Sequence, residues 1–129
     1  MILPNIETFI GCESSFEEAS IVLYGAPFDS TTSFRPGARF GPSAMRHESF
    51  GLETYSPYQD KDLIDISVFD SGDLELCFGS SEMALSDIQK RAEEILKAGK
   101  FPLLLGGEHL VTLGAVRAAA AKYPDLHII

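Results

Sequence analysis

The residue in this chain that is best suited to metal binding or catalysis is His109, which follows Gly106, Gly107 and Glu108. An apolar run over residues 101–105 precedes the glycines, and a stretch typical of a packed helix follows the histidine. His109 is therefore expected between a strand and a helix N-terminus, where the helix dipole favours the neutral imidazole that a metal ion requires. The alternative is a histidine that only caps the helix, and position alone leaves both open.

The same turn has a second possible use, because glycines before a helix N-terminus can bind phosphate. Neither G-x-G-x-x-G nor G-x-x-x-x-G-K-[ST] is present, and Glu108 would place a negative charge at the mouth of the site. A cation site is therefore favoured over an anion site.

A loop over residues 25–43, rich in Gly, Pro, Ser and Thr, supplies the next candidates. Asp29 follows the first predicted strand and should share a sheet edge with His109; it could orient a metal ligand, attract a cation or cap the local turn. Arg35 and Arg39 could anchor carboxylates or contact another subunit, and a structural role is favoured for both.

Other polar residues carry weaker signals. His47 is expected to be exposed or at an interface, and His127 has no acidic neighbour at ligand spacing. Asp70 and Asp73 bracket a predicted strand end and could line the cleft, although turn formation explains them equally well. The solvated face of a long helix accounts for Glu82, Asp87, Glu93 and Glu94.

These residues must be positioned by alternating strands and helices. We expect strands at residues 20–24, 65–69, 101–105 and 126–129, and helices at 43–50, 81–98 and from just after 109 to about 123. Residues 51–62 are expected to be irregular. The uniformly apolar run 101–105 predicts a strand buried on both faces. Such alternation predicts an α/β fold, a three-layer α/β/α sandwich with a parallel sheet.

Composition narrows the function classes. The chain has 129 residues, 45% of them hydrophobic, and a net charge of −9, which argues against a nucleic-acid partner and suits a small cationic substrate. No apolar run approaches the ~20 residues of a membrane span, and no signal peptide is visible. Cys12 and Cys77 form no C-x-x-C pair. We expect a cytoplasmic protein with reduced thiols and no membrane partner.

Five segments in order resemble the ureohydrolase family of arginases and agmatinases, most closely the bacterial-type agmatinases. The segments are Gly25-Ala-Pro-Phe-Asp29, residues 33–46, Phe69-Asp-Ser-Gly-Asp73, Ala98-Gly-Lys-Phe-Pro102 and Gly106-Gly-Glu-His109. The resemblance covers nearly the whole chain.

The resemblance implies the arginase-like form of the sandwich, with two Mn²⁺ ions at the carboxyl edge of the sheet. In that family a hydroxide bridging the metals attacks the guanidinium carbon, and agmatine would yield urea and putrescine, a step in polyamine biosynthesis. The resemblance further implies that His109 ligates one of the two ions and that the protein is a homo-oligomer.

The resemblance also implies that the other metal ligands lie beyond Ile129. Residues 1–129 are thus expected to be the N-terminal portion of a single ureohydrolase domain, inactive and poorly soluble alone. The sequence departs from many family members at Glu108, where they carry Asp, and at Leu110, where they carry Ser. Alternative activities are those of an arginase, a guanidinobutyrase or a formiminoglutamase; a non-catalytic assembly fragment is a further alternative.

Overall fold

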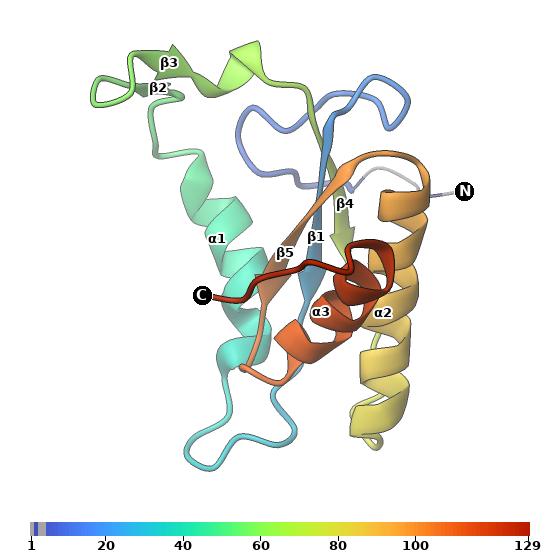
Figure 1. Cartoon of the computed structure of the whole chain (residues 1–129). Coiled ribbons are helices and arrows are strands. Elements are labelled where there is room, and N and C mark those ends of the chain that lie inside the picture. Colours follow the sequence, from blue (N-terminus) through green and yellow to red (C-terminus); the bar gives the residue numbers. More distant parts are fainter. Residues whose placement is uncertain (1, 3–4) are drawn as a thin grey trace.

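A computed structural model describes residue 2 and residues 5–129 and contains a three-stranded parallel sheet (Figure 1). Its strands are β1 (Ile21–Ala26), β4 (Val68–Asp73) and β5 (Phe101–Gly106), in the order β4-β1-β5. Ile21 pairs with Val68 on one side and with Phe101 on the other. Because the strands are parallel, the loops after all three leave the same edge of the sheet.

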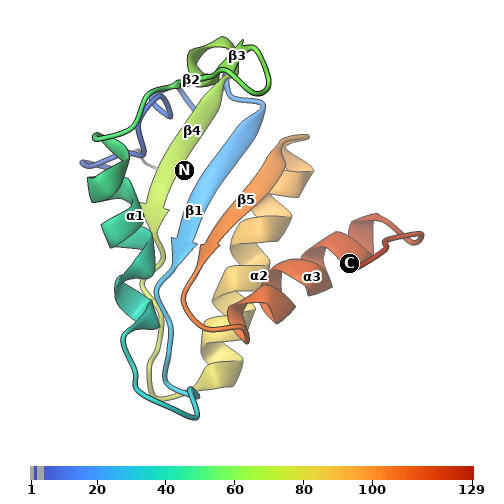
Figure 2. The same ribbon diagram turned by 90° about the vertical axis from the view of Figure 1, so that its left-hand side faces the viewer.

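Helices cover both faces of this sheet, which confirms the predicted three-layer α/β/α architecture (Figure 2). One face carries α1 (Gly41–Ser49), and the other carries α2 (Ser81–Lys97) and α3 (Val111–Lys122). The smaller elements are the 3-10 turns η1 (Ala38–Phe40) and η2 (Leu63–Asp65) and the two-residue hairpin strands β2 (Tyr55–Ser56) and β3 (Lys61–Asp62).

The helix α2 matches its prediction closely, because its signals are local. The Ser80 side chain accepts a hydrogen bond from the Met83 N–H at 3.2 Å, and Gly99 adopts a φ of +74° just past the C-terminus. The apolar stripe of α2 packs on the sheet, and the larger core cluster includes Val22, Tyr24, Phe28, Phe69, Ile88, Ile95 and Val111.

The second predicted strand is wrong in its bounds. Residues 65–69 were expected, whereas β4 runs over Val68–Asp73 and Asp65 lies in η2. Asp70 and Asp73 favoured a turn by composition, but both carboxylates pair with Arg46 of α1, and this pairing stabilises them within a strand. The first strand and α1 are displaced by only one or two residues at their starts.

Two predictions about the end of the chain are also wrong. The strand β5 is not buried on both faces: Phe101 is 64% exposed and Leu103 is 44% exposed. These alternate residues point to the same face of the sheet, on which α1 lies over β4 and β1 and leaves the start of β5 uncovered (Figure 2). Residues 126–129 form no strand.

The β4 edge of the sheet is covered by the N-terminal segment. The N–H of Ser14 donates to Val68 O at 3.1 Å, and the N–H of Asp70 donates to Cys12 O at 3.2 Å.

Residues 51–62, expected to be irregular, include the short β2–β3 hairpin. No helix within the described residues is long and apolar enough to cross a membrane.

Candidate functional site at the carboxyl edge of the sheet

The loop after β1 and the turn after β5 are held together by backbone contacts. The N–H of Gly107 donates to Ala26 O, and the N–H of Glu108 donates to Phe28 O, both at 2.9 Å. A Cβ atom on residue 107 would lie 2.1 Å from Phe28 O, so only glycine permits this approach. The second glycine of the turn therefore serves the packing of two loops.

This contact places His109 where the sequence predicted it, between β5 and α3. Its side chain is exposed and helps to line a groove of about 510 Å³ at the carboxyl edge of the sheet. The groove combines hydroxyl, carboxylate, imidazole and apolar groups from both loops, namely Thr31, Thr32, Ser33, Phe34, Glu108, His109 and Leu110.

Asp29 is 2% exposed and serves the loop itself. One carboxylate oxygen accepts the N–H groups of Gly37 and Arg39, at 2.6 and 3.2 Å, and the other accepts Nε of Arg39 at 2.6 Å. The Arg39 hydrogen bond, with the backbone donors, lowers the pKa of Asp29 from 3.8 to about 2. The carboxylate of Asp29 is thus committed to closing its own loop, which supports the turn-capping alternative.

The two loop arginines have different surroundings. Arg39 pairs with Asp29 and lies over the Phe78 ring at 4.4 Å, and Phe78 in turn stacks on Phe28. Arg39 therefore links the loop after β1 to the segment after β4. Arg35 has a positive φ of 47° and lies over the neighbouring Phe34 ring. The structural role predicted for Arg39 is confirmed, whereas a subunit contact stays a prediction for both.

Glu108 faces the loop after β1. Its Oε1 atom accepts hydrogen bonds from the N–H of Thr31 at 3.2 Å and from the Thr31 hydroxyl. The carboxylate thus joins the turn that carries His109 to the opposite wall of the groove.

Three charged side chains, those of Arg46, Asp70 and Asp73, meet between α1 and β4. The sequence did not predict that they lie together. Arg46 is 2% exposed; its Nε and Nη2 contact the two oxygens of Asp70 at 2.8 and 3.0 Å, and Nη1 reaches Asp73. Burial lowers the pKa of Arg46, but the bonds to Asp70 and Asp73 outweigh it and raise that pKa overall. Residue 25 must be glycine here, because a Cβ would lie 1.8 Å from Asp73 Oδ1.

The signal for this cluster was an arginine four positions after Pro42 in a short polar helix, together with two aspartates at a strand end. The spacing of these three residues along the chain does not indicate that their charges meet between α1 and β4.

The remaining predicted residues lie apart from the groove. His47 is exposed, with Nδ1 at 3.2 Å from Glu7, and His127 is exposed. The Cys12 thiol is buried, and its pKa is raised to about 11, mainly by desolvation, so it is unsuited to act as a nucleophile.

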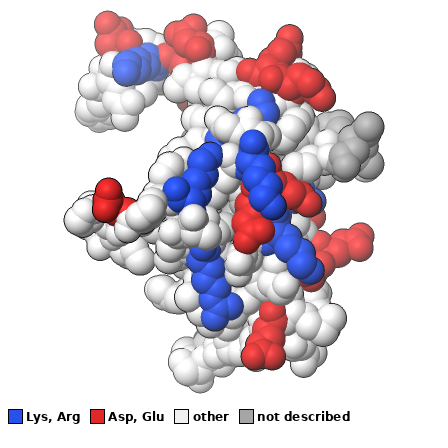
Figure 3. All heavy atoms as spheres, turned by 45° about the vertical axis from the view of Figure 1, so that its right-hand side comes forward, with Lys and Arg blue, Asp and Glu red and all other residues white. Residues whose placement is uncertain are grey.

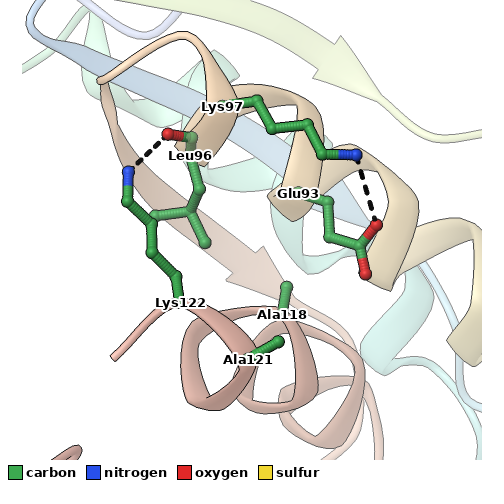
Figure 4. Close-up of a pocket in the computed structure, with 6 residues that line it drawn as sticks. All are labelled: Glu93, Leu96, Lys97, Ala118, Ala121 and Lys122. Carbon is green, nitrogen blue, oxygen red and sulfur yellow. Dashed lines mark hydrogen bonds and ion pairs between the residues drawn. The ribbon is translucent and has the colours of Figure 1, made fainter. Parts of the chain in front are cut away.

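A second groove lies between α2 and α3 (Figure 4). Its floor includes Leu96, Ala118 and Ala121; Lys122 donates to Leu96 O, and Lys97 lies 3.9 Å from Glu93. Basic side chains gather over these helices among acidic ones (Figure 3). Each polar group named here already has a partner, so this face is a solvated helix surface and not a centre for chemistry.

The described residues do not make a complete metal site. His109 offers one imidazole at the sheet edge, but no group of three or more His, Cys, Asp or Glu in the described part of the chain could hold a metal ion. Asp29 and Glu108 are engaged by the loop. One exposed imidazole suits a ligand but cannot by itself retain an ion that prefers several oxygen donors.

These features define a parallel α/β protein with a groove beyond the carboxyl ends of its strands, the place where open α/β sheets bind their ligands. A model of the arginase family matches residues 19–129, and the chain belongs to that family.

Three known proteins illustrate the likeness. The agmatinase of Bacillus anthracis is 51% identical over 123 residues, 95% of this chain and 42% of that protein. The agmatine ureohydrolase of Thermoplasma volcanium superimposes with a TM-score of 0.82 at 33% identity, covering 88% of this chain and 39% of that one. A Trypanosoma cruzi formiminoglutamase, determined with Mn²⁺, gives 0.76 at 25% identity, over 91% and 42%. This chain therefore spans about 40% of the length of these relatives.

Proposed function

We propose that a protein containing this chain is an amidino hydrolase of the agmatinase type, which converts agmatine to urea and putrescine. The observation that carries the proposal is the 51% identity with the Bacillus anthracis agmatinase over 95% of the chain. Putrescine formation would place the enzyme in polyamine biosynthesis.

The groove at the carboxyl edge supports this reaction class. His109 is exposed there and free to serve as one ligand of a two-ion Mn²⁺ centre, with the other ligands supplied by residues outside this chain. When bound, such a centre supplies the Lewis acidity that makes water nucleophilic at neutral pH. The net charge of −9 favours the approach of a cationic guanidino substrate.

We further propose that the 129 residues alone are inactive, because one imidazole does not retain two ions that require several oxygen ligands. The complete protein is proposed to be a cytoplasmic homo-oligomer whose partner is the small cationic substrate.

The test is a substrate panel with the complete protein, purified without metal and then supplied with Mn²⁺. Agmatine, arginine and guanidinobutyrate are assayed for urea, and formiminoglutamate for formamide. We expect agmatine to give the highest kcat/KM. A higher kcat/KM for another substrate would assign the protein to that activity, and no turnover of any of the four would overturn the hydrolase proposal.

A further inference from the structure

One wall of the groove beside His109 is formed by residues 31–34, a polar and largely exposed loop segment. An exposed loop wall keeps one shape only if contacts outside its own backbone hold it. Asp29 holds the loop at two places. Its carboxylate accepts the N–H groups of Gly37 and Arg39, and its carbonyl oxygen accepts the hydroxyl of Thr32 at 3.0 Å and the N–H of Thr32 at 3.4 Å. These bonds all lie within the loop, so they do not fix it relative to the turn that carries His109.

A bond from outside the loop comes from the turn that carries His109. Oε1 of Glu108 accepts both the N–H and the hydroxyl of Thr31, so one carboxylate oxygen bridges from the floor of the groove to its wall. Hydrogen bonds to an ionised acceptor are stronger than neutral ones. None of the ion pairs in the described portion of the chain involves Glu108, which leaves its charge available for Thr31.

The position of Glu108 is itself fixed by the backbone. Its N–H donates to Phe28 O at 2.9 Å, and the preceding residue packs against the backbone of Phe28. The carboxylate therefore extends from a fixed backbone position toward an exposed loop segment.

We propose that Glu108 is a positioning residue that clamps Thr31, fixing the wall of residues 31–34 against which the substrate binds beside His109. Glu108 acts on the shape of the groove and not on metal retention. The effect on substrate rests on the function proposed above, whereas the clamp itself does not.

The clamp is tested by hydrogen exchange on the complete protein with and without Glu108→Ala. Losing a charge-assisted bond should speed exchange of the amides at residues 31–34 by roughly tenfold, with α2 unchanged. Glu108→Gln, which keeps an acceptor oxygen, should restore most of the protection. Glu17→Ala, an exposed carboxylate before β1, is the matched control and should change nothing at residues 31–34. Unchanged exchange in Glu108→Ala would overturn the clamp.

The role in substrate binding is tested by kinetics and metal content of the same variants. We expect Glu108→Ala to raise KM for agmatine roughly three- to tenfold, with kcat and Mn²⁺ content near those of the unaltered protein. Thr31→Val, which removes only the hydroxyl donor, should raise KM less. Lost Mn²⁺ or a fall in kcat alone would show that Glu108 acts through His109 and would overturn the proposal. If the unaltered protein hydrolyses none of the panel, the proposed function fails, while the exchange result still decides the clamp.

Discussion

At the scale of single residues, the carboxyl edge of the sheet holds two kinds of polar group: one stabilises the loop, and the other is exposed and available to bind a ligand. Asp29 is buried and fully engaged by Arg39 and Gly37, while His109 is exposed. From sequence, an acidic residue next to a strand end is a good candidate for a metal ligand. Here, however, the Asp29 carboxylate accepts hydrogen bonds from its own loop. This leaves the imidazole as the chemically available group of the two.

Asp29 should make stability depend on pH. Its pKa lies at about 2 in the folded chain against 3.8 ordinarily, so its stabilisation is complete above about 4 and is lost as pH falls toward 2. In Asp29→Asn the free energy of unfolding should be lower at pH 7, and this part of the acid dependence should disappear. Denaturant titrations of the complete protein at several pH values measure both. The control is Asp125→Asn, an exposed residue, and identical acid profiles for Asp29→Asn and the unaltered protein would refute the assignment.

At the scale of elements, the sequence predicts well where the signals are local and poorly where charges meet across the fold. The helix α2 has a serine cap and Gly99 in the left-handed region, and both can be read from neighbouring residues. The strand β4 was misplaced because Asp70 favours a turn locally, whereas the distant Arg46 and the N–H of Phe9 stabilise its carboxylate within a strand. His109 and the turn were predictable for the same local reasons, but the contact between Glu108 and Thr31 was not.

The close approach of two loops makes a prediction about the Gly107 turn. Gly107→Ala would drive a Cβ into the Phe28 backbone, so we expect a loss of about 1–3 kcal/mol in the free energy of unfolding, as for overpacked sites. It should also disturb His109, which follows two residues later. Gly51→Ala is the matched control, because its Cβ would meet Glu48 O at an ordinary 3.5 Å. Equal stability of the two variants in urea titrations would contradict the packing argument.

At the scale of the whole molecule, the sheet has one covered edge and one open edge. The N-terminal segment lies along β4, as the bridge between Glu13 and Phe69 illustrates, whereas the outer edge of β5 is unpaired among the described residues (Figure 1). Phe101 and Leu103 of β5 are also exposed. Unpaired strand edges promote association between chains. The relatives are more than twice as long as this chain, and we propose that further residues of the complete protein cover this edge.

The open edge should govern how the 129 residues behave alone. We expect the isolated chain to self-associate, and Leu103→Lys to raise its monomeric fraction, because a charge on an edge strand opposes pairing. The same substitution should destabilise the complete protein, where this face would be covered. Size-exclusion chromatography of the isolated chain and thermal unfolding of the complete protein measure the two effects. A monodisperse monomer of the unaltered isolated chain would contradict the prediction.

The most direct test of the whole account is the bound metal of the complete protein with His109 replaced by Asn. If His109 is a ligand at the carboxyl edge, His109→Asn should bind less Mn²⁺ per subunit and lose at least roughly 100-fold in agmatine hydrolysis, with its circular dichroism unchanged. His47→Asn, an exposed histidine outside the groove, should keep both properties. Full Mn²⁺ content and full activity in His109→Asn would contradict the account.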